Sequence, residues 1–206
     1  PLEETLSAFD DLIRQGKVHY IGFSEWTAPQ IAQALAIQEA RGYNRFVSSQ
    51  PQYSALWRVI EAQVVPLSKK EGIGQIVWSP MAQGVLTGKY LPGVKPPAGS
   101  RATDKKSGAG FISAFMKDEI LTAVQNLKPI AADHDLTTSQ LALAWVLQNE
   151  NVSSAIMGAT KPAQVRENVK ASGVKLSQEV MAAIDKILGD LPERSADMDK
   201  TPRPRA

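Results

Sequence analysis

Apolar side chains at the start of the chain recur at the spacing of one helix face. They are Leu2, Leu6, Phe9, Leu12 and Ile13. Pro1 opens this stretch and Gly16 closes it, so the pattern predicts a helix over residues 1–15. A short apolar segment at 18–22 follows and predicts a strand.

The same alternation of short apolar segments and amphipathic segments continues along the chain. Strands are predicted at 18–22, 46–50, 73–79 and 152–157, and helices at 1–15, 27–42, 56–70, 115–133, 138–148, 162–172 and 178–188. Thr27 can cap the second helix, and Gly42 ends it. The third helix is either broken at Pro66 or begins irregularly before it.

Two segments do not follow this pattern. Residues 91–113 contain many Gly and Pro positions and few apolar ones, which predicts a long surface loop of the kind that often forms a lid. Residues 192–206 combine proline with charge and predict an extended or disordered tail. The pattern therefore predicts one domain over residues 1–191.

Strands that alternate with helices indicate parallel βα units, because parallel neighbours need a crossover connection. Four such units make half of a (β/α)8 barrel, and they are also compatible with an open doubly wound sheet. The hydrophobic pattern leaves both architectures open.

Composition narrows the function classes. The net charge of +2 is spread along 206 residues, which disfavours a nucleic-acid partner. The longest apolar run, 141–147, is too short to span a bilayer, so no membrane insertion is expected. The chain has no cysteine, which excludes disulfides and Cys-based metal sites and fits a cytoplasmic protein.

Five segments in order carry a resemblance to a known family. They are GFSEW at 22–26, QPQY at 50–53, WSPMAQG at 78–84 with TGKY at 87–90, LALAW at 141–145, and GAT at 158–160 leading to Glu167 and Asn168. Together they resemble the aldo/keto reductases, most closely the branch of the potassium-channel beta subunits and their bacterial relatives. The resemblance implies a parallel (β/α)8 TIM barrel, of which this chain supplies the fifth to eighth strands, the C-terminal half.

The resemblance implies a nicotinamide site at the ends of the first three predicted strands. Its residues are Ser24, Glu25, Gln50, Trp78, Ser79, Pro80, Met81, Ala82 and Gln83. Trp78 would stack on the nicotinamide ring, and Ser24 and Gln50 would pair with its carboxamide. Glu25 departs from the family's usual Asn, and a carboxylate cannot donate the hydrogen bond that an amide would.

The phosphates and adenosine are expected at two further places. Lys89 and Arg101 flank the 91–113 loop, and the family places comparable cations on the cofactor phosphates with the loop folded over them. Gly158 would let the backbone approach a ligand at a helix start. The remaining candidates are Ala159, Thr160, Lys161, Gln164, Glu167 and Asn168. The positive charges favour NADP(H) over NAD, and the alternative for 158–168 is an ordinary capped helix.

No catalytic residue can be carried over from the family. Aldo/keto reductases use a Tyr, a Lys, an Asp and a His on earlier strands, and His19, His134 and Tyr53 do not match those motifs. We expect the N-terminal half of the same barrel to be a partner, whether cleaved, omitted or missing. A half-barrel alone would be inactive, and its unpaired edge strands would favour a homo-oligomer.

The leading functional hypothesis is an NADPH-dependent oxidoreductase that reduces a small aldehyde or ketone. The alternatives are a cofactor-sensing regulatory subunit, a catalytically incomplete half-barrel that only binds, and a phosphate-binding barrel unrelated to reductases. No metal site is predicted. The identity of the carbonyl substrate is not predicted, because loops that are outside this sequence would build most of its pocket.

Overall fold

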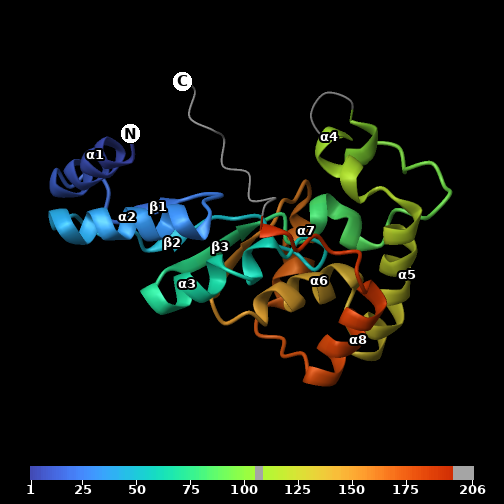
Figure 1. Cartoon of the computed structure of the whole chain (residues 1–206). Helices are drawn as coiled ribbons and strands as arrows, with labels where there is room; N and C mark the ends of the chain where they lie inside the picture. The colour runs from blue at the N-terminus through green and yellow to red at the C-terminus, as the bar shows by residue number, and fades with distance from the viewer. Residues whose placement is uncertain (105–108, 197–206) are drawn as a thin grey trace.

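Four strands form one parallel sheet in the order β1–β2–β3–β4 (Figure 1). The computed structural model describes residues 1–104 and 109–196. The strands are β1 (Gly22–Phe23), β2 (Ser48–Ser49), β3 (Gly74–Trp78) and β4 (Val152–Ile156). The predicted α/β class and parallel arrangement are therefore confirmed. Within the described residues the sheet is open, with β1 and β4 at its edges.

The regular parts of β1 and β2 are shorter than the sequence predicts. Only Gly22 and Phe23 pair in register with Ser48 and Ser49. The extended backbone nevertheless continues the pairing, because Gln50 N donates to Phe23 O at 2.8 Å. Gly22 is required at this contact, since a Cβ there would lie 2.4 Å from the Ser48 hydroxyl. Close approach of the two chains therefore fixes the start of the sheet.

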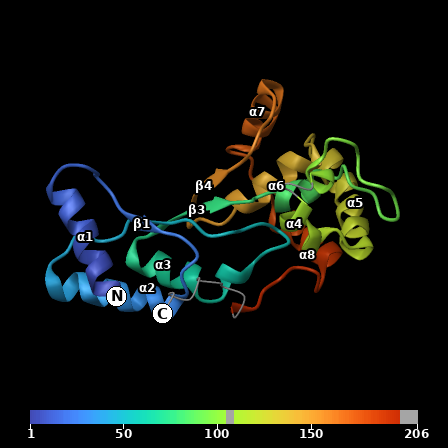
Figure 2. The same ribbon diagram turned by 90° about the horizontal axis from the view of Figure 1, so that it is seen from above.

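Helices lie at both ends of the sheet (Figures 1 and 2). All of them except the seventh, residues 162–168, contribute to one continuous apolar core. The helices are α1 (Leu2–Arg14), α2 (Ala28–Arg41), α3 (Val64–Glu71), α4 (Ala109–Ile112), α5 (Asp118–Asp133), α6 (Thr138–Leu147), α7 (Pro162–Asn168) and α8 (Gln178–Leu188). Thr27 caps α2 in a reciprocal capping box with Gln30, as its sequence position predicts. Gly42 ends α2 with the left-handed φ of 66° that favours glycine.

The third helix begins irregularly, which is one of the two alternatives the sequence left open. A short 3-10 turn, η1 (Val59–Glu61), precedes α3, and the predicted start at residue 56 is wrong. Pro66 lies in the first turn of α3, where the missing N–H is not needed for an intrahelical bond.

Short helical turns interrupt the predicted loop. They are η3 (Arg101–Thr103), α4 and η4 (Ser113–Phe115). Ile112 and Phe115 are buried in the core, which explains why 109–115 folds against the body of the protein. The predicted helix over 115–133 accordingly begins later, at Asp118. Residues 105–108 of the predicted loop lie outside the described residues.

Arg58 connects the segment after β2 to the helices at the far end of the sheet. Its guanidinium is buried, forms an ion pair of 2.7 Å with Asp185 on α8, and lies 4.5 Å from the ring centre of Trp145 on α6. Its backbone N–H donates to Glu193 O at 2.7 Å. Glu193 in the tail is therefore bonded to the core, and residues 197–206 lie outside the described residues.

Asp10 ties α1 to the segment before β2. This buried carboxylate accepts hydrogen bonds from the backbone N–H of Asn44 at 2.8 Å, from the Asn44 amide at 2.7 Å and from Arg14 at 2.5 Å. The backbone bond first, and then the Asn44 amide and Arg14, lower the pKa of Asp10 despite its burial. The ionised form is thus favoured in the folded state.

We expect Asp10→Asn to lower stability in a pH-dependent way. A depressed folded-state pKa adds stability above the unfolded value of about 3.9 and loses it as the pH falls through the folded value. The difference in urea midpoint between wild type and variant should be largest at pH 7 and shrink below about pH 4. A difference that stays constant down to pH 3 would contradict this role.

Candidate functional site

The carboxyl ends of β1, β2 and β3 meet at one edge of the sheet, where parallel sheets usually hold their ligands. Ser24 directly follows β1, Gln50 directly follows β2, and Trp78 ends β3. The Ser24 hydroxyl donates to the Gln50 carbonyl at 2.7 Å. The sequence predicted these three residues together, and the structure places them on adjacent strands.

Glu25 connects the ends of three strands through one carboxylate oxygen. Its Oε1 accepts from the Trp78 indole Nε1 at 2.7 Å and from the backbone N–H of Gln52 at 2.5 Å. Gln52 lies beyond β2 and forms a parallel bridge with Trp78. The carboxylate is thus bound to the protein itself, and Trp78 is partly exposed beside it.

Backbone strain concentrates around this edge. Among the described residues, five non-glycine positions have positive φ, and four belong to the predicted site: Glu25, Ser79, Ala82 and Gln83. Such conformations cost free energy and persist only where the surrounding structure enforces them. The buried side chains of Pro80 and Ala82 provide part of that enforcement. These two residues therefore pack beneath the site rather than face a ligand.

The turn after β3 carries a polar network. This turn is η2 (Ala82–Thr87), preceded by Ser79 and by Met81, which packs against the core. The Gln83 amide donates to the Ser79 hydroxyl, and Arg101 donates to the Gln83 carbonyl oxygen across 18 positions of sequence. The structure therefore brings Arg101 back to the site segment.

Lys89 lies close to the same turn, at Gly84. A Cβ built at Gly84 would be 3.4 Å from its ammonium group, which is 5.1 Å from the Tyr90 ring centre. Both Lys89 and Arg101 are exposed. Two cations thus flank residues 83 and 84, close to Trp78 in sequence.

The predicted phosphate segment begins at the same edge of the sheet. The register pairs Trp78 with Ile156, and Gly158 follows two residues later. Gln164 Oε1 accepts from the backbone N–H groups of Thr160 at 2.7 Å and Lys161 at 3.1 Å. These N–H groups therefore converge on one acceptor oxygen, supplied by the protein's own side chain. An open hollow of about 470 Å³ lies beside them, between Ala159 and Arg166.

Helix α7 carries the remaining predicted residues and projects from the body of the protein (Figure 2). None of its residues is buried. Glu167 forms an ion pair of 2.8 Å with Lys170, and its carbonyl accepts from Gln140 on α6 at 2.8 Å. Glu167 is therefore held by protein contacts on both its backbone and its carboxylate.

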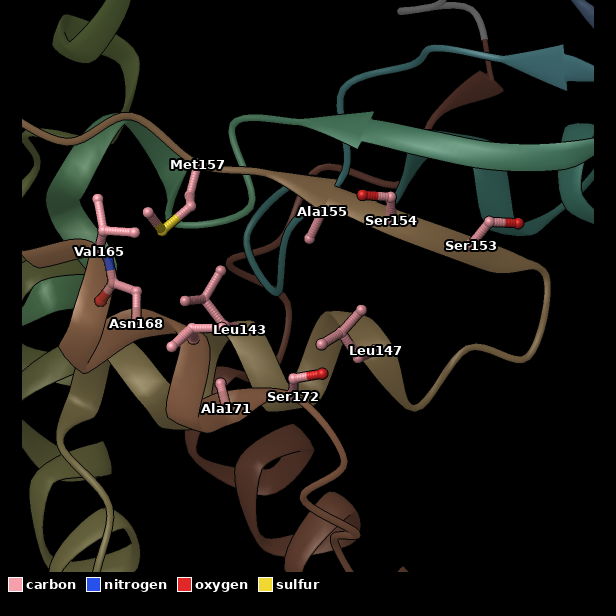
Figure 3. A pocket seen from close by; sticks show the side chains of 11 residues that line it. Leu143, Leu147, Ser153, Ser154, Ala155, Met157, Val165, Asn168, Ala171 and Ser172 are labelled. Atoms are coloured by element: carbon pink, nitrogen blue, oxygen red, sulfur yellow. The ribbon is translucent and has the colours of Figure 1, made fainter.

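An apolar groove lies between β4, α6 and α7 (Figure 3). Its volume is about 330 Å³, and its lining comprises Leu143, Leu147, Ser153, Ser154, Ala155, Met157, Val165, Asn168, Val169, Ala171 and Ser172. Of the predicted site residues only Asn168 contributes. The sequence did not predict this groove, because it depends on how α7 stands relative to β4 and α6, which no local pattern sets.

Tyr53 and His134, two of the three residues that do not match the family's catalytic motifs, make contacts within the protein. The buried Tyr53 donates to Glu61 at 2.7 Å, and burial, with the Glu61 carboxylate, raises the pKa of Tyr53 far above its usual value. His134 Nδ1 lies 2.9 Å from the Ile130 carbonyl at the end of α5, and His19 is exposed. The Tyr53 backbone N–H donates to the Trp78 carbonyl at 3.2 Å, so Tyr53 adjoins the Trp78 edge, but its hydroxyl is bonded to Glu61.

Two searches of the described part of the chain bear on other site types. No group of three or more His, Asp or Glu side chains is placed to hold a metal ion. No helix there has both the length and the apolar character that crossing a membrane requires.

Comparison with known proteins decides the family. The sequence matches the model described as "Aldo/keto reductase family" over residues 1–189. The chain belongs to the aldo/keto reductase family. The expected resemblance is confirmed, and the family implies a (β/α)8 barrel.

Curated relatives of this aldo/keto reductase carry potassium-channel names. A protein of Schizosaccharomyces pombe named "Putative voltage-gated potassium channel subunit beta" is 44% identical over 198 residues, which is 93% of this chain and 56% of the relative. Proteins of Arabidopsis thaliana and Oryza sativa subsp. japonica, each named "Probable voltage-gated potassium channel subunit beta", are 38% identical over 94% and 95% of this chain. Each match spans 60% of these two relatives.

We expect Gln83→Leu to loosen the 100–104 segment, because Arg101 loses its acceptor on the turn. Backbone amides of Thr103 and Asp104 should exchange with solvent about three-fold to ten-fold faster, as the loss of one exposed charge-assisted bond implies. Hydrogen exchange measured by NMR or mass spectrometry tests this. The exposed Gln33→Leu on α2 is the control, and equal exchange in both variants would contradict the proposed link.

Proposed function

We propose that this chain forms the cofactor-binding part of an NADPH-dependent oxidoreductase that reduces an aldehyde or ketone. The observation that carries the proposal is the partly exposed Trp78 indole, held at the carboxyl end of β3 by Glu25. Gln50 follows the neighbouring strand β2, and Ser24 follows β1, the next strand along. An aromatic face beside hydroxyl and amide groups suits a flat ring that carries a carboxamide.

The residues around Trp78 fit a nicotinamide dinucleotide. Trp78 supplies a stacking surface, and Lys89 and Arg101 supply positive charge for phosphate oxygens at the next turn. When bound, the cofactor supplies the hydride for carbonyl reduction. Lys161 adds a third exposed cation, and this surplus of positive charge supports NADP(H) over NAD(H).

The segment 158–168 is proposed to bind the phosphate and adenosine end. Gln164 Oε1 marks where an acceptor oxygen fits between the N–H groups of Thr160 and Lys161. A phosphate oxygen could take the place of Gln164 Oε1 between these two N–H groups if the Gln164 side chain rotated toward the ligand. Gly158 leaves open space for this approach, because a Cβ built there would meet nothing within 4 Å.

The proton donor and the rest of the barrel are proposed to come from a further segment of the same protein. This chain spans little more than half the length of the relatives it matches. The exposed Ile156 on the outer strand β4 and the groove beneath α7 offer an apolar surface for it. In this proposal the present chain is the C-terminal half, with strands five to eight, and is inactive alone.

A second candidate function is a cofactor-sensing regulatory subunit. The names of the relatives favour it, since all three are called potassium channel beta subunits. Such a protein would bind NADPH, turn it over slowly, and associate as an oligomer with a membrane protein. Either candidate would act in the cytoplasm.

We expect Trp78→Ala to weaken NADPH binding by about ten-fold, because the stacking surface is lost. In the full protein that contains this chain, NADPH should quench tryptophan fluorescence and support reduction of a simple aromatic aldehyde. Trp78→Ala should diminish both signals.

The matched control is Trp57→Phe, because Trp57 is a second partly exposed tryptophan and its ring packs edge-on against Phe115. Quenching with steady aldehyde reduction supports the enzyme, and quenching with little turnover supports the regulatory subunit. The absence of any response to NADPH in the wild-type protein would overturn both candidates.

A further inference from the structure

Glu25 belongs to the predicted nicotinamide site, and its carboxylate bonds to two other residues of the protein. One oxygen accepts from the Trp78 indole at 2.7 Å and from the Gln52 backbone at 2.5 Å. Indole has a single polar hydrogen, so this bond uses the only one that Trp78 can donate. The contact spans 53 positions of sequence and joins the outer strand β1 to β3.

The turn that carries Glu25 is fixed on both sides. Phe23 stacks on Trp26 at 5.0 Å between ring centres, and Trp26 meets Phe46 edge-on at 5.6 Å. Thr27 then opens α2 with its capping box. Glu25 lies between these anchored residues with a φ of 57°, a strained conformation that its neighbours maintain.

We infer that Glu25 is a positioning residue that holds the Trp78 ring in one orientation and biases the site toward the oxidised cofactor. The inference rests on the proposed function, because the ring is the surface proposed for the nicotinamide. Without the bond, a partly exposed indole can turn about its side-chain torsions, and a ligand must then immobilise it on binding.

The bias toward the oxidised cofactor follows from the negative charge of Glu25. An oxidised nicotinamide ring is a cation, and the reduced ring is neutral. The Glu25 carboxylate lies within hydrogen-bond distance of the Trp78 ring edge, so it attracts the cationic form of a ring stacked there and leaves the neutral form little affected. An Asn at this position would provide no such attraction. Glu25 therefore acts on the balance between the two cofactor forms rather than on overall affinity alone.

Two variants of the full protein separate the two roles. Glu25→Gln keeps an acceptor oxygen of the same reach but removes the charge, whereas Glu25→Leu removes both. The control is Glu4→Gln. Glu4 is an exposed carboxylate in the first turn of α1, outside the predicted site, and this substitution removes the same charge.

The first measurement needs no cofactor. The Trp78 indole N–H signal, followed by NMR with the Trp57 indole as internal reference, should stay near its wild-type position in Glu25→Gln. In Glu25→Leu it should shift and exchange with solvent at least ten-fold faster. An unchanged Trp78 signal in Glu25→Leu would overturn the positioning role, whatever the protein binds.

The second measurement compares dissociation constants for NADP+ and NADPH. The ratio of NADPH to NADP+ affinity should rise about three-fold to ten-fold in Glu25→Gln and stay unchanged in Glu4→Gln. Equal ratios in wild type and Glu25→Gln, with binding intact, would overturn the charge bias and leave the proposed function standing. If neither form binds to the wild-type protein, both the bias and the proposed function are overturned.

Discussion

The parallel alignment of β1 to β4 is the constraint on which the rest of this structure depends. Because the four strands run in the same direction, the residues after each of them emerge at one edge of the sheet. Ser24, Gln50 and Trp78 are far apart in sequence and become neighbours only through that register. The Glu25 carboxylate then bonds across the strand ends and fixes the one aromatic ring of the group.

The backbone at this same edge of the sheet is strained. Positive φ at Glu25, Ser79 and Gln83 is unfavourable. Hydrogen bonds at the edge accompany it, from Trp78 to Glu25 and from Gln83 to Ser79. Arg58, buried between Trp145 and Asp185, joins the segment after β2 to α6 and α8. The segment that carries the polar groups after β2 is thus attached to the packed helices. Such support allows a site to be formed before its ligand binds.

Much of the fold followed from local sequence signals. The ends of α2, α6 and α8 match the prediction because caps such as Thr27 and Thr137 and the stop at Gly42 act within one helical turn. The lengths of β1 and β2 did not follow, because ladder pairing depends on neighbours distant in sequence. The helical turns at 109–115 were missed because short apolar segments beside glycine resemble loop. For the site, the family resemblance indicated which positions gather at the sheet edge. The bond from Trp78 to Glu25 could not be predicted, since only the strand register sets that distance.

The central claim is that the carboxyl ends of β1 to β3 form one nicotinamide site in this aldo/keto reductase. A crystal structure of the full protein grown with NADPH tests it most directly. The account predicts the nicotinamide ring stacked on Trp78, with the Trp78 indole still bonded to Glu25 and the phosphates beside Lys89 and Arg101. A cofactor bound elsewhere, or a ring that makes no contact with Trp78, would contradict it.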